Sequence, residues 1–335
     1  MPKVSVIIPV YEVEKYIERC ARSLFEQTLD DIEYIFVDDC SPDKSIAILE
    51  NIIKEYQPRL NKEHKNVRIE KMSQNIGLPN VRRCGIKLAT SDYIAHCDSD
   101  DWVELDMYQQ MYNKAIEEDA DVVVCDYVVT NGTSVIKTIN ACHAKSPGQL
   151  IENCLFQRDP WPLWNKLFKR KAYSNIEYPK GAMGEDMVTT IQLLWNCKTL
   201  SYINKPYYQY FYNSESITKV CTRDSCIRKF NQLLCNSDIV LGLIEKKHLE
   251  DYYEESLVVY KNFIRSILYP IVYEKQYHKK WNSMFKGLNR QVIFSKHISL
   301  SEKCRVILTM FHLYPRKKIG HINRIFVQKA LLFHF

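Results

Sequence analysis

The sequence predicts an α/β fold, with a mostly parallel β-sheet covered by helices on both faces and a mainly helical C-terminal region. From Val4 to Asp126, short β-branched runs alternate with segments of helical periodicity at the spacing of βαβ units. From about Cys226 the apolar residues recur at helical spacing. With 335 residues, 46% hydrophobic and 26% charged, the chain is neither disordered nor fibrous. We expect two domains, at residues 1–220 and 221–335.

The elements follow from the pattern in order. The runs that predict strands are Val4–Val10, Ile32–Val37, Val67–Glu70, Tyr93–Cys97 and Val122–Cys125. Helices are expected at Ile17–Phe25, from a Ser41 N-cap with Pro42 in the first turn to Tyr56, at Leu78–Leu88 and at Leu105–Ile116. Asn131-Gly132 predicts a hairpin turn between residues 127–130 and 134–139, and Ser299 with Glu302 predicts a helix cap.

Three strand ends mark the candidate site. In open α/β sheets ligands bind beyond the carboxyl ends of the strands. This rule selects Pro9–Glu12, Asp38–Asp43 and Asp98–Asp101, the last of which holds three carboxylates in four residues. Unpaired carboxylates at this spacing repel one another, so Mg²⁺ or Mn²⁺ is one explanation. An acidic cluster at the start of a helix is the other.

Phosphate-binding glycine motifs are missing. No GxGxxG follows the first strand and no GxxxxGK[ST] occurs, which argues against dinucleotide binding and P-loop chemistry. An aspartyl-nucleophile phosphatase places its DxD after the first strand, whereas this strand ends in Pro9-Val10-Tyr11-Glu12. Any phosphate would therefore be held by metal and side chains.

Four segments together resemble the family 2 glycosyltransferases of the GT-A fold: Val4–Tyr11, Val37–Asp43, Asn75–Gly85 and Tyr93–Trp102. The resemblance implies a nucleotide-sugar donor, a divalent metal (Mn²⁺ or Mg²⁺) and inversion at the anomeric carbon. It implies that Asp100 is a metal ligand, with Asp98 and Asp101 as further metal-site residues. It also implies the donor-binding residues Pro9, Tyr11, Glu12, Asp38, Asp39, Arg82 and Asp98. In this assignment Asp39 faces the base, and Arg82 pairs with Asp38 or the diphosphate.

The resemblance continues more sparsely to about residue 220. Trp161–Phe168 resembles a segment near the acceptor, which suggests acceptor or phosphate contacts for Trp164 and Lys166; a solvated lysine is the plain alternative. Gly184-Glu185-Asp186 matches a motif whose aspartate is the general base, so Asp186 is the expected catalytic residue and Glu185 a neighbour at the acceptor. An aspartate that complements the helix dipole is the alternative. Tyr207–Tyr212 and Ser216–Thr218 resemble the end of the catalytic domain, but Phe211 stands where an arginine is expected.

The charge is divided along the chain. Residues 261–335 hold 15 Lys or Arg and two acids, a net charge of +13, whereas residues 1–260 carry −7. Residues 316–333 interleave bases with apolar residues, which favours a segment on an anionic membrane surface; a helix packed on its own domain is the alternative. We expect no nucleic-acid partner, because no recognition motif occurs.

Other features concern the compartment. No apolar run approaches the roughly 18–20 residues of a membrane span, and Val4–Val10 is too short for a signal peptide. None of the 12 cysteines forms a CxxC pair, which fits a reducing compartment. We expect a cytoplasmic enzyme, peripheral on the inner face of a bacterial membrane, that builds a surface polysaccharide on a saccharide or lipid-linked acceptor. The rival is a degenerate homologue that binds nucleotide-sugar or membrane without turnover, for which Phe211 is the main support.

Overall fold

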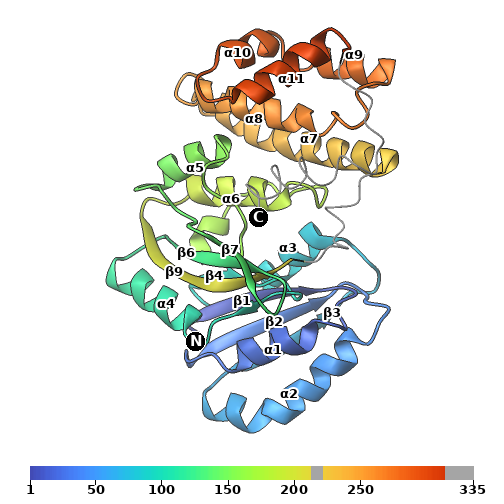
Figure 1. Ribbon diagram of the computed structural model, residues 1–335. Coiled ribbons are helices and arrows are strands. Elements are labelled where there is room, and N and C mark those ends of the chain that lie inside the picture. The colour runs from blue at the N-terminus through green and yellow to red at the C-terminus, as the bar shows by residue number, and fades with distance from the viewer. Residues whose placement is uncertain (213–221, 314–335) are drawn as a thin grey trace. The chain divides into compact units, whose positions relative to one another are not determined.

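The computed structural model describes residues 1–212 and 222–313, and the remaining residues are drawn in grey in Figure 1. The chain forms two compact units, which are described separately. The first comprises residues 1–150, 162–182 and 189–213, and the second residues 151–161, 183–188 and 214–335. The predicted Ser216–Thr218 segment and the basic segment 316–333 lie outside the described residues.

The first unit is built on one sheet, whose strand order among the described residues is β3-β2-β1-β4-β8-β6-β9-β5, with β7 paired to β6. Its N-terminal half is parallel and consists of β1 (Val4–Val10), β2 (Ile32–Asp38), β3 (Asn66–Lys71) and β4 (Tyr93–His96). Beyond β4 the sheet is mixed. The strands there are β5 (Trp102–Val103), β6 (Val122–Thr130), β7 (Val135–Ile139), β8 (Lys166–Lys169) and β9 (Leu200–Phe211). Strands β6 and β9 are parallel, and β8 runs antiparallel to both β4 and β6.

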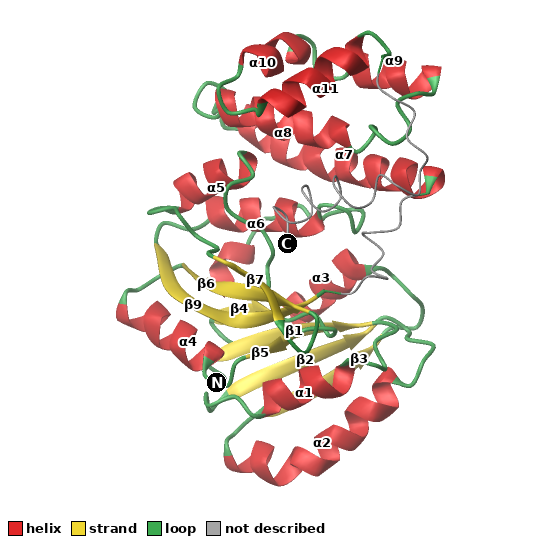
Figure 2. Cartoon of the chain, in the orientation of Figure 1, coloured by secondary structure: helices red, strands yellow, loops and turns green. Residues whose placement is uncertain are grey.

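Helices cover the parallel half from both sides, as predicted. In Figure 2, α1 (Ile17–Phe25) and α2 (Ser45–Lys62) lie below the strands, and α3 (Leu78–Leu88) lies above them. The approach of α3 to β1 requires a glycine, because a Cβ at Gly85 would lie 2.4 Å from Cγ2 of Ile7. The other helices that include residues of this unit are α4 (Met107–Glu117), the 3-10 helix η1 (Arg170–Tyr173), and parts of α5 (Pro147–Leu155) and α6 (Glu185–Trp195).

The predicted elements are largely confirmed. Helix α3 has the predicted bounds, and β6 and β7 form the expected hairpin around Asn131-Gly132. One prediction is wrong, because Ser41 does not cap α2. That helix begins at Ser45 after Lys44 as its N-cap, and the Ser41 hydroxyl instead accepts a hydrogen bond from the Glu12 amide at 2.9 Å. The N-cap therefore lies three residues later than predicted, at Lys44 instead of Ser41, because the chain bends before the helix starts.

The described part of the second unit is mainly helical, as predicted. Its helices are α7 (Arg223–Lys246), α8 (Glu254–Ser266), α9 (Lys275–Ser283), α10 (Leu288–Phe294) and α11 (Leu300–Met310). They bury a shared core that includes Phe230, Leu268 and Trp281. Ser299 caps α11, since its side chain accepts a hydrogen bond from the Glu302 amide. Within residues 1–212 and 222–313, no helix combines the length and the apolar character that crossing a bilayer requires.

Candidate functional site

The carboxyl ends of β1, β2 and β4 meet at one edge of the sheet. Val10 at the end of β1 lies opposite Asp38 at the end of β2. On the other side of β1, Ile7 lies opposite His96, the last residue of β4. The loops after these three strands therefore start side by side, and they carry the residues that the sequence selected.

The loop after β1 presents exposed side chains at this edge. Tyr11 is 40% exposed, and Glu12, also exposed, adopts a left-handed backbone with φ of 52°. The backbone of the loop is fixed by the region before α2: the Glu12 amide donates to Ser41 Oγ, and the Val13 amide donates to Ser45 Oγ at 3.0 Å. This anchoring leaves the Tyr11 and Glu12 side chains accessible to a ligand.

The two aspartates after β2 are buried and organise the neighbouring turns. Asp39 accepts hydrogen bonds from the backbone amides of Ile76 (2.6 Å) and Gly77 (3.0 Å), directly before α3. Asp38 accepts one from the Ser41 amide at 2.8 Å. The carboxylate of Asp39 therefore joins the β2 loop to the start of α3, and its predicted contact with a base stays a prediction.

The third loop is tied to α3 by an ion pair. Arg82 Nη2 lies 2.6 Å from Asp98 Oδ1, and the arginine is 3% exposed. The Asp98 side chain is 29% exposed, and its pair with the buried guanidinium is a charge-assisted hydrogen bond. The sequence predicted Asp38 or a diphosphate as the partner of Arg82, and the structure places Asp98 beside it.

The next two carboxylates of this loop have different surroundings. Asp100 is partly exposed, and burial, with Asp98 as a second cause, raises its pKa to about 6. Asp101 is fully buried, and both of its oxygens are occupied: Oδ1 accepts from the Phe211 amide at 2.7 Å, and Oδ2 from the Tyr208 hydroxyl at 2.8 Å. Burial raises the pKa of Asp101 well above its usual value, with Asp100 and Asp98 adding to the shift.

The carboxylates of this loop differ in their capacity to bind a metal. Asp98 and Asp100 hold accessible oxygen atoms, whereas those of Asp101 already accept hydrogen bonds. Among residues 1–212 and 222–313, no group of three or more His, Cys, Asp or Glu side chains is arranged to hold a metal. One or two carboxylates that share Mg²⁺ with substrate phosphates are the usual arrangement. The residues present therefore fit a metal that is completed by a phosphate ligand.

An aromatic stack supports the carboxylate loop from β9. The Trp164 ring lies 4.1 Å from that of Tyr208 and 5.9 Å from that of Tyr210, nearly parallel to both. Trp164 is 1% exposed, so it packs in the core of the first unit. Beside it, Lys166 is fully buried and donates to the Pro162 carbonyl at 2.8 Å and Asn165 Oδ1 at 2.9 Å. The alternative of a solvated Lys166 is therefore wrong, and acceptor contacts of Trp164 and Lys166 stay predictions.

The turn that carries Asp186 belongs to the second unit and is held by α7. Gly184 has a φ of 77°, and a Cβ there would lie 2.6 Å from Leu233 Cδ1. On the preceding residue, the Met183 amide donates to Gln232 at 3.3 Å and its carbonyl accepts from Asn236 at 2.9 Å. Glu185 and Asp186 then open α6, with Glu185 buried and Asp186 partly exposed. The glycine and two polar residues of α7 thus fix the backbone from which Asp186 projects.

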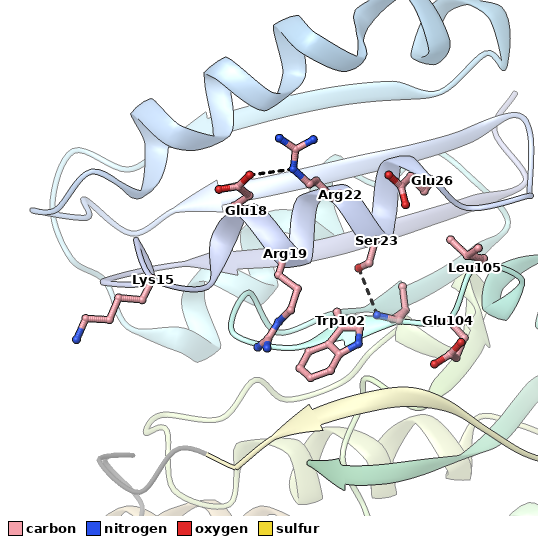
Figure 3. A pocket seen from close by; sticks show the side chains of 10 residues that line it. Lys15, Glu18, Arg19, Arg22, Ser23, Glu26, Trp102, Glu104 and Leu105 are labelled. Carbon is pink, nitrogen blue, oxygen red and sulfur yellow. Dashed lines mark hydrogen bonds and ion pairs between the residues drawn. The ribbon is translucent and has the colours of Figure 1, made fainter. Parts of the chain in front are cut away.

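Two functional candidates were missed by the sequence. Tyr208 belongs to an aromatic run whose members are alike in sequence, and only the fold shows which hydroxyl reaches the carboxylate loop. Arg19 lies in α1, and its guanidinium carbon is 3.6 Å from the Trp102 ring centroid. It also lines a pocket of about 590 Å³ between α1 and the loop after β5 (Figure 3). No linear motif marks Arg19, and the Tyr207–Tyr212 segment does not single out Tyr208.

Comparison with known proteins shows which family the chain is similar to. Residues 5–178 match the family described as Glycosyl transferase family 2. EpsH of Bacillus subtilis strain 168 is 30% identical over 269 residues, which cover 76% of this chain and 73% of EpsH. The poly(ribitol-phosphate) beta-N-acetylglucosaminyltransferase TarP of Staphylococcus aureus strain N315 is 29% identical over 218 residues, 63% of this chain and 62% of TarP.

The fold comparison agrees. The structure of S. aureus TarS 1-349 in complex with UDP-GlcNAc is similar with a TM-score of 0.68 and 17% identity, over 93% of this chain and 88% of the TarS chain. At that identity the likeness is one of fold. The aligned part of the chain spans between 32% and 89% of the length of the curated relatives that it matches.

Proposed function

This chain belongs to glycosyl transferase family 2, and on that premise we propose that it transfers a sugar from a nucleoside-diphosphate sugar to a hydroxyl group of a saccharide or lipid-linked acceptor. The observation that carries the proposal is the meeting of three loops at one sheet edge: the loop after β1 carries exposed Tyr11 and Glu12, and the loop after β4 carries the Asp98–Asp101 carboxylates. A UDP-sugar is the proposed donor, and the UDP-GlcNAc bound by TarS, which has a similar fold, supports that choice.

The donor would be held by residues of the first unit. Pro9, Tyr11 and Glu12 would line the nucleoside pocket, and Asp38 and Asp39 would shape its other wall through the turns that they hold. Asp98 and Asp100 would bind Mn²⁺ or Mg²⁺ together with the diphosphate, because their oxygens are partly exposed. When bound, such a metal supplies Lewis-acid stabilisation of the leaving diphosphate. Arg82 orients Asp98 by its ion pair, and Asp101 holds the loop in place.

The proposed chemistry is a single inverting displacement. The acceptor hydroxyl must lose its proton as it attacks the anomeric carbon, and Asp186 is the proposed general base that accepts it. Support comes from its sequence motif and from its partial exposure on a turn that α7 fixes. Glu185 is buried next to Asp186 in the chain, and acceptor or phosphate contacts of Trp164 and Lys166, which are buried in the first unit, are proposed on their sequence motif alone.

Hydrolysis of UDP-sugars in the presence and absence of Mn²⁺, together with transfer to an acceptor, tests these roles. We expect Asp100→Ala to abolish metal-dependent hydrolysis, whereas Asp92→Asn, an exposed aspartate at the opposite end of β4, leaves it unchanged. Asp186→Asn should lower transfer about 10²–10⁴-fold, the usual contribution of a general base. The matched control is Asp224→Asn, a 93% exposed aspartate in the first turn of α7. If both first-turn variants behave alike, Asp186 serves only the helix dipole.

The rival function is binding without turnover, for which Phe211 is the motivating residue. A thermal-shift panel of nucleotide-sugars with Mn²⁺ would identify the donor under either function. Binding without hydrolysis or transfer by the wild-type protein would favour the rival.

We further propose that the second unit contacts an anionic membrane surface on the cytoplasmic side of a bacterial membrane, where a surface polysaccharide is built. The TarP similarity supports a surface-polymer acceptor. Helix α11 carries an exposed apolar stripe formed by Leu300, Ile307, Leu308 and Phe311. Residues 261–313 around it hold ten bases and two acids, a net charge of +8. Bases near an anionic leaflet contribute about 1 kcal/mol each.

Co-sedimentation with phosphatidylglycerol-containing vesicles tests this contact in the full chain. Leu308→Glu with Phe311→Glu should abolish sedimentation, whereas Val135→Glu, at a 59% exposed apolar position in the first unit, should not. Equal binding to neutral phosphatidylcholine vesicles, or binding unaffected by the α11 changes, would contradict the proposal.

A further inference from the structure

Arg19 is held by aromatic rings from two other elements. Its guanidinium carbon lies 3.6 Å from the centroid of Trp102, the residue that follows Asp101, and 4.7 Å from that of Phe211 at the end of β9. Figure 3 shows the side chain reaching from α1 to the Trp102 indole. The Phe211 ring is in turn 5.2 Å from that of Tyr16, one turn before Arg19. Cation–π contacts of this kind fix the plane of a guanidinium.

The same guanidinium reaches the carboxylate loop. Arg19 Nη2 donates to the carbonyl of Asp100 at 3.0 Å. On the opposite side of the loop, Arg82 from α3 pairs with Asp98 at 2.6 Å. Two arginines from different helices therefore hold the two ends of the segment Asp98–Asp100. The loop cannot shift toward either helix without losing one of these contacts.

The carboxylates of Asp101 and Asp100 favour the charged form of Arg19 from a distance, but neither forms an ion pair with it. Among the described residues no acid lies within ion-pairing distance of it, and its buried Nε has no hydrogen-bond partner. Buried donors are nearly always satisfied, so an orphan of this kind calls for an explanation. The hairpin turn passes close to both side chains, because a Cβ at Gly132 would lie 3.3 Å from Arg19 Nη1 and 3.3 Å from the Phe211 ring.

We propose that Arg19 is a positioning residue that fixes the Asp98–Asp101 loop from α1 and keeps a positive charge beside the site of the donor diphosphate. The inference rests on the proposed nucleotide-sugar function. Phe211 belongs to the same cluster of contacts, because its ring packs on the Arg19 guanidinium and its amide donates a hydrogen bond to Asp101. An aromatic residue at this position therefore need not indicate lost activity, since the cation is supplied from α1 instead.

Isothermal titration of the full chain with UDP in the presence of Mn²⁺ tests the assignment. Arg19→Gln keeps a hydrogen-bond donor but loses the charge, and we expect its UDP affinity to fall about five- to twentyfold, the scale of one partly screened charge. Arg19→Lys keeps the charge without the planar contact and should fall between Gln and wild type. Arg22→Gln, one turn further along α1 and paired with Glu55, is the matched control and should bind as wild type does.

A second-site variant distinguishes the loss of the positive charge from a loss of structural stability. In the Arg19→Gln background, Phe211→Arg returns a cation to the same cluster and should restore UDP affinity to within about threefold of wild type. If the role of Arg19 were purely structural, the double variant would bind UDP no better than Arg19→Gln, because it also loses the packed Phe211 ring. Steady-state kinetics should show the loss mainly in KM for the donor rather than in kcat.

The outcomes are distinguishable. If wild type does not bind UDP with Mn²⁺, the proposed function fails and this inference with it. If wild type binds and Arg19→Gln binds equally well, the inference alone is overturned. Loss of affinity in Arg19→Gln without rescue by Phe211→Arg would also overturn the charge assignment.

Discussion

The Tyr208 hydroxyl joins β9 to the carboxylate loop through two hydrogen bonds, in addition to the bond from the Phe211 amide, so Tyr208→Phe is an informative perturbation. The hydroxyl donates to Asp101 Oδ2 at 2.8 Å and accepts from the Asp98 amide at 3.0 Å. Phenylalanine keeps the ring stacked at 4.1 Å on Trp164 but removes both hydrogen bonds. The change therefore isolates the polar contribution from the packing.

The expected cost follows from burial. Asp101 is fully buried, and a buried group that loses its partner costs about 1–3 kcal/mol, with charged groups at the upper end. The Asp98 amide adds a second, smaller loss, so we expect a decrease of about 2–4 kcal/mol in the free energy of unfolding. At roughly 2–4 °C per kcal/mol for a unit of this size, the melting temperature should fall by at least about 4 °C.

Thermal unfolding followed by circular dichroism measures this shift, with Tyr207→Phe as the control. The Tyr207 hydroxyl makes a long 3.4 Å contact with Asp106, which is 35% exposed, and interacts with the exposed Lys205, so its removal should change the melting temperature by about 1 °C or less. If the two variants melt together, the bonds of Tyr208 do not support the loop, and the stability assigned to them is refuted.

Three further predictions concern stability elsewhere. Arg265 is fully buried, donates to Asn262 and Asn289, and lies 4.1 Å from the Trp281 ring; Arg265→Ala should therefore cost about 2–4 kcal/mol, measured by urea unfolding with tryptophan fluorescence. Burial by itself would raise the pKa of Asp121, but Lys171 and the Lys198 amide outweigh it and the pKa falls to about 2. Its contribution is thus present above pH 3.8 and lost as the pH falls from about 4 through 2, so Asp121→Asn should cost about 1–2 kcal/mol at pH 7 and little below pH 2. Gly85→Ala should destabilise by about 1–3 kcal/mol through its clash with Ile7, whereas Gly242→Ala in α7, where a Cβ meets nothing within 4 Å, should stabilise by about 0.5–1 kcal/mol; equal effects would contradict the packing of α3 on β1.

Much of the fold was predictable because its signals are local. The β-branched run Val4–Val10 predicts a strand and the apolar periodicity of Leu78–Leu88 predicts a helix from consecutive residues alone. Both elements form within the predicted bounds. Ser41 was misplaced because a cap is decided by which amide the hydroxyl reaches, and here the Glu12 amide, distant in sequence, competes with the helix start.

The candidate site was only half predictable. The carboxylates Asp98, Asp100 and Asp101 stand together in the sequence, but their different exposure appears only when β9 brings the Phe211 amide to Asp101. For Lys166 the sequence left open an acceptor or phosphate contact and a solvated lysine, and the structure buries it against Pro162 and Asn165. Burial of a charged side chain depends on neighbours that no short segment contains.

By itself the sequence determined the α/β order, the family and the strand ends that carry carboxylates, because periodicity and motif spacing are properties of consecutive residues. Only the tertiary structure decided that Arg19 and Arg82 hold the same loop from two helices, and that Tyr208 fastens it from a strand more than a hundred residues away. These contacts depend on how separate elements pack, and that packing brings together residues whose positions in the chain give no sign of it.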